Sequence, residues 1–198
     1  MKRPLKLTLL TTCAALCAGI SLPLLVGNDT FHPERDSVQS ETLSYSVPLQ
    51  VPEEVRFADE VIPLDRYDLR ERMDRELMAF TYMHSSTMLT IKRANRYFPI
   101  IEPILKENGL PDDLKYLAVI ESSLNPLARS RAGAAGMWQF MKGTGRDFGL
   151  EVNTNIDERY HIEKSTRAAC DYLKQAYAKY GSWLCVAASY NAGQARIS

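Results

Sequence analysis

The fold is decided by residues 111–141, which read PDDLKYLAVIESSLNPLARSRAGAAGMWQFM. Pro111 and the two aspartates after it are typical of a helix start, because proline lacks the amide hydrogen that a first turn leaves unpaired and acids there favour the helix dipole. The predicted helix runs through Leu114 to Ser123. It ends before Asn125-Pro126, because the residue that precedes a proline is disfavoured in helical geometry.

Glu121 falls near the middle of the apolar arc of this predicted helix. At about 100° per residue, the arc is formed by Leu114, Leu117, Ala118, Ile120 and Leu124. A carboxylate there loses hydration, and glutamate is almost never fully buried without a partner. Either Glu121 pairs with an arginine such as Arg129 or Arg131 and is structural, or its apolar neighbours raise its pKa so that it holds a proton and acts as a general acid.

The segment after this helix has the composition of a binding loop. Residues 128–136 are small apart from two arginines, so a bulky ligand can approach the backbone closely. Residues 137–141, MWQFM, combine aromatic, thioether and amide side chains, as sugar sites do. The lysine and glycines after them have the wrong order for a phosphate loop. Asp157 is predicted to cap a long helix that runs through Tyr180 to Gly181, and a last helix carries residues 189–193, SYNAG.

Residues 64–109 are predicted to be helices that pack against the core. Apolar residues recur there at spacings of four, four and three, which is the spacing of one helix face: Leu69, Met73, Leu77 and Phe80. Ser85 or Ser86 is predicted to cap the next helix, Pro99 and Pro103 to break or kink the helical segment beyond that cap, and Gly109 to stop it.

The N-terminal 26 residues are predicted to be a targeting segment. Lys2, Arg3 and Lys6 precede a mostly apolar stretch over residues 7–26, which is the order of an export signal. The stretch is also long enough to cross a bilayer, so a cleaved signal peptide and a retained membrane anchor both stay open. Residues 27–63 are polar, carry four prolines and show no helical period, which predicts an extended arm.

Composition and charge exclude several classes of function. The 24 basic and 24 acidic residues balance, and without the three cations of the leader the charge is 21 − 24 = −3, so nucleic acid is not an expected partner. The three histidines are scattered, and neither a metal nor a cofactor is implied. Cys170 and Cys185 flank Gly181 at unequal heights on two antiparallel helices, so both are predicted to be buried thiols without a disulfide.

Three blocks of this sequence resemble the signature of the soluble-lytic-transglycosylase family: residues 121–126, ESSLNP, residues 133–141, GAAGMWQFM, and residues 189–193, SYNAG. The resemblance implies an all-α, goose-lysozyme-like fold, with residues 110–198 as the catalytic core. It implies cleavage of the β-1,4 bond between N-acetylmuramic acid and N-acetylglucosamine of peptidoglycan strands in the periplasm or cell envelope. It makes Glu121 the catalytic acid and base, and places at the sugar site Ser130, Gln139, Met141, Tyr190 and Asn191.

The expected mechanism depends on a single acid. Most glycosidases use two carboxyl groups, and the three blocks contain no second one. Glu121 is therefore predicted to protonate the glycosidic oxygen and then to take a proton from the C6 hydroxyl of the muramoyl sugar, which closes a 1,6-anhydro ring. Two alternatives stay open: a goose-type lysozyme that hydrolyses the bond, and a wall-binding module or inactive fragment. The second arises because the family continues past the last block with helices that close the groove, so the core is expected to be truncated at Ser198.

Overall fold

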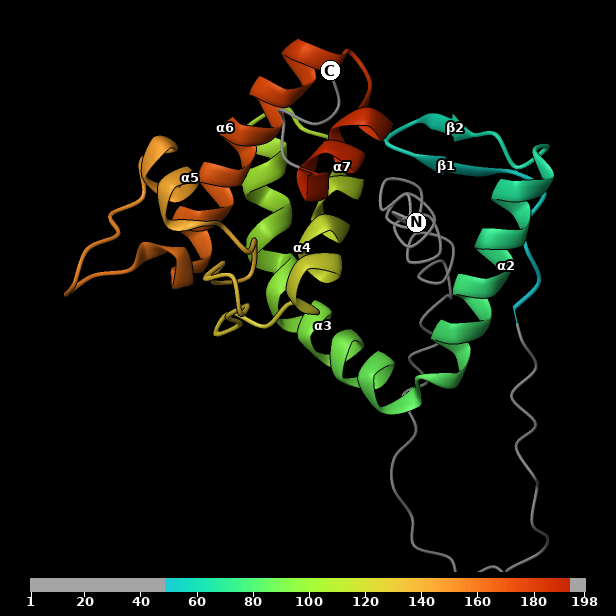
Figure 1. Cartoon of the computed structure of the whole chain (residues 1–198), viewed down its shortest axis with the longest axis horizontal. Coiled ribbons are helices and arrows are strands. Elements are labelled where there is room, and N and C mark those ends of the chain that lie inside the picture. Colours follow the sequence, from blue (N-terminus) through green and yellow to red (C-terminus); the bar gives the residue numbers. More distant parts are fainter. Residues whose placement is uncertain (1–48, 193–198) are drawn as a thin grey trace, which may run out of the picture.

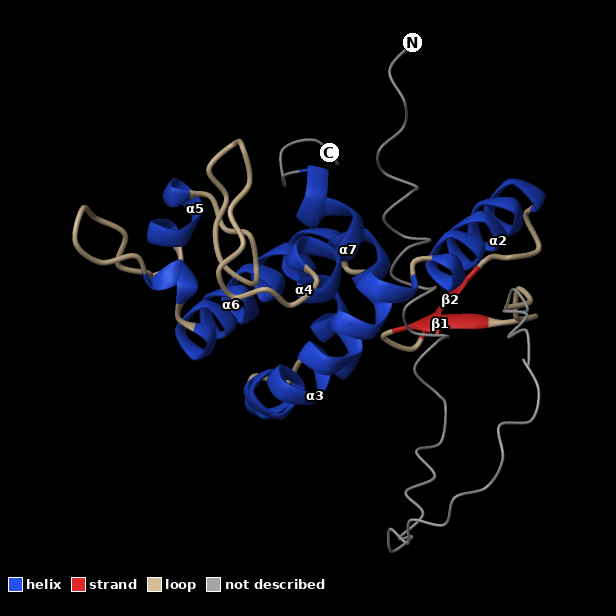
Figure 2. Cartoon of the chain, turned by 90° about the horizontal axis from the view of Figure 1, so that it is seen from below, coloured by secondary structure: helices blue, strands red, loops and turns tan. Residues whose placement is uncertain are grey.

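Helices make up most of the structure, a computed structural model that describes residues 49–192 (Figures 1 and 2). The predicted mainly α fold is confirmed. In chain order the elements are β1 (Val55–Phe57), β2 (Glu60–Ile62), α2 (Tyr67–Tyr82), α3 (His84–Glu107), the 3₁₀ turn η1 (Asp112–Leu114), α4 (Lys115–Ser122), α5 (Lys142–Asp147), the 3₁₀ turn η2 (Glu158–Tyr160), α6 (Ile162–Tyr180) and α7 (Trp183–Ala192). The predicted leader, the first part of the predicted arm and the side chain of Asn191 lie outside the described residues.

Within residues 49–192 no helix combines the length and apolar character needed to span a bilayer. The same part of the chain holds no group of three or more histidine, cysteine, aspartate or glutamate side chains arranged as metal ligands.

A small β-hairpin occupies part of the segment for which the sequence predicts an extended arm. β1 and β2 are antiparallel, with Phe57 opposite Glu60, and the two-residue turn between them has positive φ angles of 51° at Ala58 and 65° at Asp59. Such a turn matches the right-handed twist of the two strands. The sequence does not reveal the hairpin because the turn lacks the Asn-Gly or Asp-Gly pair that usually marks this conformation.

The α2 stripe is confirmed, since Leu69, Met73 and Leu77 are buried. α3 begins at His84, directly after Met83, so the predicted serine cap was wrong, and the Ser86 hydroxyl instead donates back to the Met83 carbonyl at 2.9 Å. α3 also runs unbroken through Pro99 and Pro103, although its axis changes direction in Figure 1, as internal prolines cause.

α4 is shorter than predicted and lies among α3, α6 and α7 (Figures 1 and 2). Pro111 precedes the helical residues with an extended ψ of 138°, and a 3₁₀ turn separates it from α4. The predicted end is confirmed, because Ser123 and Leu124 adopt left-handed φ angles of 50° and 55° before Asn125-Pro126. Two consecutive left-handed residues without glycine form a strained turn that begins two residues after Glu121.

Capping of α6 differs from the prediction. Asp157 caps η2, where its side chain accepts from the Arg159 amide, and His161 caps α6 by accepting from the Lys164 amide. The end of α6 at Gly181 is confirmed, with a left-handed φ of 65°. Cys170 and Cys185 are free thiols, but Cys185 is exposed and not buried as predicted.

Candidate active site

Glu121 lies in the last turn of α4 and is half-buried. Leu117 and Ala118 of the same helix are fully buried, so α4 is fixed in the core and carries Glu121 to its edge. Burial, the charge of Glu121 and the neighbouring Tyr172 hold the pKa of the Tyr190 phenol well above its usual range. The Glu121 carboxylate of the first sequence block therefore lies near enough to the Tyr190 phenol of the third block to contribute to its raised pKa.

Tyr190 links α7 to the second block. Its hydroxyl donates to the Trp138 carbonyl at 2.9 Å, and its ring packs edge-on against Tyr172 with centroids 5.1 Å apart. With its raised pKa the phenol is neutral near pH 7. Tyr190 is therefore suited to hydrogen bonding and not to proton abstraction, and its oxygen retains the capacity to accept a further hydrogen bond.

Ser122 links the first block to the second. Its hydroxyl lies 2.8 Å from the Met137 carbonyl, and it accepts from the Asn125 amide at 3.2 Å. The residue after Glu121 therefore fixes both the start of the MWQFM segment and the strained turn that ends α4.

The MWQFM segment is mostly core, which corrects its interpretation as a sugar-binding mixture. Trp138 is fully buried and its indole donates to the Thr166 hydroxyl of α6 at 3.0 Å. Met137 and Phe140 are buried as well. The two predicted site residues of this segment remain accessible: Gln139 is half-buried and Met141 is 45% exposed.

Ser130 and Gln139 have structural bonds within the loop. The Ser130 hydroxyl oxygen accepts from the Ala134 amide at 3.0 Å. Gln139 has a left-handed φ of 50°, and its side-chain amide donates to the carbonyls of Gly136 at 2.8 Å and Ala128 at 3.3 Å. The two side chains shape the loop after Glu121, and the Ser130 hydroxyl hydrogen and the Gln139 amide oxygen retain capacity for a ligand.

Arg159 is a site-supporting residue that sequence reasoning missed. Its side chain is 2% exposed, and its guanidinium donates two hydrogen bonds to the Asp157 carboxylate, at 2.8 and 2.7 Å. It also donates to the loop carbonyls of Gly133 and Phe140, each at 2.8 Å. The hydrogen bond and charge of Arg159 lower the pKa of Asp157. No periodicity or short motif marks Arg159, because its loop partners lie 19 and 26 residues away in sequence.

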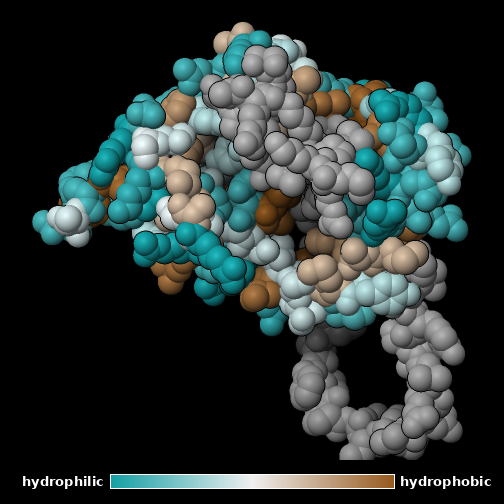
Figure 3. Space-filling view, viewed as in Figure 1, coloured by the Kyte–Doolittle hydropathy of each residue, from teal (hydrophilic) through white to brown (hydrophobic). Residues whose placement is uncertain are grey.

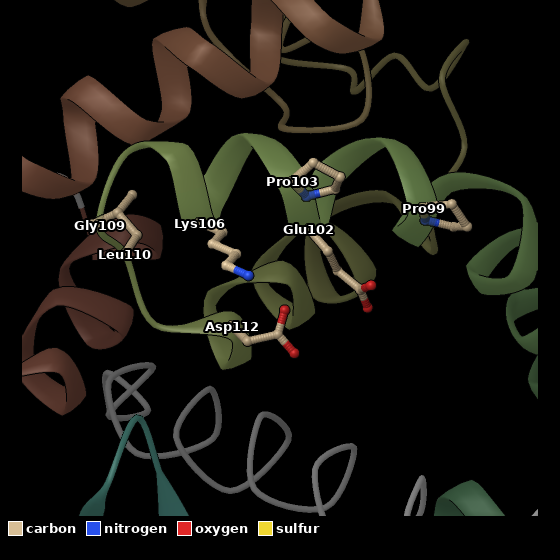
Figure 4. Close-up of a pocket in the computed structure, with 7 residues that line it drawn as sticks. All are labelled: Pro99, Glu102, Pro103, Lys106, Gly109, Leu110 and Asp112. Atoms are coloured by element: carbon tan, nitrogen blue, oxygen red, sulfur yellow. The ribbon is translucent and has the colours of Figure 1, made fainter.

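A pocket of about 710 Å³ lies elsewhere, between the second half of α3 and η1 (Figure 4). Its charged lining residues are Glu102, Lys106 and Asp112. Figure 4 shows the Glu102 and Asp112 carboxylates pointing toward the same space, and the buried Lys115 ammonium bonds both of them, at 2.7 and 2.5 Å. None of the predicted site residues lines this pocket, and its two acids form ion pairs with the buried Lys115. The space-filling view in Figure 3 shows the hydrophilic and hydrophobic side chains of the described residues on one face of the molecule.

The fold and the convergence of the three blocks define a lysozyme-like transglycosylase domain. The chain belongs to the Transglycosylase SLT domain family, whose sequence model matches residues 98–198, and the family expected from the sequence is thereby confirmed. Over 130 residues, or 65% of its length, the chain is 35% identical to membrane-bound lytic murein transglycosylase D of Escherichia coli strain K12, of which the match covers 28%. It is 28% identical over 59% of its length to a putative tributyltin chloride resistance protein of Alteromonas sp. strain M-1, of which 56% is covered. It is 34% identical over 51% of its length to peptidoglycan transglycosylase gp16 of Escherichia phage T7, of which 8% is covered.

Proposed function

We propose that this chain is a lytic transglycosylase that cleaves the β-1,4 bond between N-acetylmuramic acid and N-acetylglucosamine in peptidoglycan. The observation that carries the proposal is the meeting of the three family blocks around one acid. Glu121 acts on the pKa of Tyr190, Tyr190 donates to Trp138, and Ser122 bonds Met137. Relatives named as murein and peptidoglycan transglycosylases support the same activity.

Glu121 is the proposed acid and then the proposed base. Its proton passes to the glycosidic oxygen, the bond from that oxygen to C1 of the muramoyl sugar breaks, and the electron pair leaves with N-acetylglucosamine. The Glu121 carboxylate then takes the proton of the muramoyl C6 hydroxyl, whose oxygen bonds C1. The products are a 1,6-anhydro end and a Glu121 that again holds its proton, so neither a water nor a second carboxylate is consumed.

The remaining predicted residues form the proposed sugar site. Ser130 and Gln139 present their remaining polar atoms from the loop, and Met141 offers an exposed apolar side chain at the start of α5. Tyr190 offers a neutral oxygen beside Glu121. Asn191 completes the site by its place in the third block.

The cell envelope is the proposed location. The substrate lies there, and the name of the Escherichia coli relative describes a membrane-bound protein. Export by the apolar segment of residues 7–26, cleaved or retained as an anchor, belongs to the same proposal.

The deciding experiment digests purified murein with the unmodified chain and with Glu121→Gln, and identifies the released muropeptides by mass spectrometry. Glutamine keeps the shape of Glu121 and removes its transferable proton, so release is expected to fall at least about a hundredfold. Glu163→Gln is the control, because Glu163 is exposed in the first turn of α6.

Each alternative has its own result in this assay. Products about one water heavier than anhydro ends identify a hydrolase of the goose-lysozyme type. Binding to murein without release identifies a wall-binding module. A loss below about tenfold in Glu121→Gln contradicts the assignment of the acid.

A further inference from the structure

The β-hairpin caps the helix that carries Tyr190. One oxygen of the Glu60 carboxylate accepts from the Trp183 amide at 2.5 Å, and the other accepts from the Ser182 hydroxyl at 2.6 Å and the Leu184 amide at 3.2 Å. The Ser182 oxygen in turn accepts from the Cys185 amide at 3.3 Å. The first three amides of α7, which lack partners within the helix, are thus satisfied by Glu60 together with Ser182.

The same hairpin is tied to the element that leads into α4. The amide of Ala58, in the hairpin turn, donates to the Asp113 carboxylate of η1 at 2.8 Å. Asp113 precedes the first residue of α4 by two positions. Two nearby residues of the hairpin, Ala58 in its turn and Glu60 at the start of β2, therefore contact the 3₁₀ turn that leads into α4 and the start of α7. Figure 1 shows the hairpin beside the first turn of α7.

The far ends of these two helices carry the proposed chemistry. Glu121 lies in the last turn of α4, and Tyr190 lies seven residues beyond Trp183, about 10 Å along α7. A shift or rotation at the start of α7 therefore moves the Tyr190 hydroxyl relative to both the Glu121 carboxyl and the Trp138 carbonyl.

We propose that Glu60 is a positioning residue for the active site, because it fixes the start of α7 to the hairpin and so sets the place of Tyr190 beside Glu121. The inference rests on the proposed function. It deepens that function by adding a residue that lies far from the sugar site in sequence and outside the three family blocks.

Other contacts also hold α7, which makes a folded variant attainable. Trp183 stacks on Tyr177 of α6, with ring centroids 4.0 Å apart. Val186 and Ala187 are buried in the core. Removal of the Glu60 carboxylate is therefore expected to leave α7 packed but displaced, and not to unfold the chain.

The test is a double-mutant cycle of Glu60→Ala and Tyr190→Phe, measured as the rate of anhydro-muropeptide release below the melting temperature of each variant. Glu60→Ala is expected to lower turnover between about tenfold and a hundredfold, the scale of a small misplacement at an active site. Since Glu60 acts through Tyr190, the double variant is expected to be no slower than Tyr190→Phe alone. Glu60→Gln keeps one acceptor oxygen for the Trp183 amide, so its turnover is expected to lie between those of Glu60→Ala and the unmodified chain.

Glu54→Ala is the matched control, because Glu54 is an exposed acid just before β1 whose only described partner is the exposed Arg56. Its turnover is expected to equal that of the unmodified chain. Additive losses in the cycle overturn the inference, because they mean that Glu60 acts independently of Tyr190. Unchanged turnover in folded Glu60→Ala and Glu60→Gln overturns it as well. If the unmodified chain itself releases no anhydro products, the proposed function fails, which is a different result from an active chain that is indifferent to Glu60.

Discussion

Gly136 lies in the loop that follows α4, where the backbone of η2 packs closely against it, and its replacement by alanine tests the architecture of the candidate site. A Cβ atom added there would lie 1.8 Å from the carbonyl oxygen of Arg159 and 2.7 Å from its carbonyl carbon. Gly136 also has a φ of 78°, in the left-handed region. The neighbour cannot yield easily, because Arg159 is held by its two bonds to Asp157 and by its bonds to the loop itself.

The expected loss of stability has two parts. A left-handed conformation at a residue with a Cβ atom costs about 1–2 kcal/mol. To reach even 3.0 Å the Arg159 oxygen must retreat by about 1.2 Å, the difference between 3.0 and 1.8 Å, and overpacking of this kind typically costs about 1–3 kcal/mol. Together they predict a loss of about 2–5 kcal/mol, or roughly 4–20 °C in melting temperature for a chain of this size.

Alanine variants of two other glycines distinguish the backbone cost from the overpacking cost, with thermal unfolding followed by circular dichroism. Gly133→Ala meets no atom within 4 Å but has a φ of 92°, so it is expected to show the backbone cost alone. Gly143 lies in α5 with open space and no positive φ, so Gly143→Ala is expected to stabilise the chain by about 0.5–1 kcal/mol. A Gly136→Ala variant as stable as Gly133→Ala would show that the loop and η2 are not in contact.

Two further predictions concern titrating groups. The hydrogen bond and charge of Arg159 lower the pKa of Asp157 from its ordinary value of 3.8. As the pH falls, the unfolded chain therefore takes up this proton before the folded chain does. The stability that this carboxylate contributes is present above about pH 4 and is lost below it. Asp157→Asn should remove this part of the loss of stability in acid. The difference in melting temperature between the unmodified chain and Asp157→Asn should therefore shrink from pH 6 to pH 2. Parallel plots of melting temperature against pH for the two proteins would contradict the ion pair. Burial raises the pKa of the Cys170 thiol to about 11, whereas Cys185 is exposed. Alkylation at pH 8 followed by peptide mapping should therefore modify Cys185 and spare Cys170, and equal labelling would show that α6 opens in the native state.

Local regularities of the sequence predict the helices well. The α2 stripe of Leu69, Met73 and Leu77 has the helical period, and Gly109 and Gly181 stand where α3 and α6 end because each adopts the left-handed conformation there. Predictions failed where several local signals competed. Asp157 is a good cap, but a 3₁₀ turn comes after it, and the residue that caps α6 is His161, four positions later.

The sequence predicts more of the residues that carry the proposed chemistry than of the residues that hold the candidate site in place. Glu121 stands out because it is a carboxylate on an apolar helix face, and the three blocks predict Tyr190 at the same site. Trp138 was misjudged for a physical reason: an aromatic residue beside glutamine suits a sugar platform and a core position equally well, and its burial depends on Thr166 of α6.

The supports of the site escaped prediction because several of their bonds are to backbone groups of residues that are distant in sequence. Glu60 reaches a helix start 122 to 124 residues away, and Arg159 holds carbonyl groups that every residue possesses. Every residue has a backbone carbonyl that can accept a hydrogen bond. The type of the accepting residue therefore does not indicate that such a bond exists. Gly136 is the exception, because the approach of the Arg159 carbonyl excludes any side chain there. Gly136 is therefore the one residue of the small-residue loop whose type reflects this support. Its lack of a side chain makes room for the backbone of Arg159 and not, as the sequence alone suggests, for a ligand.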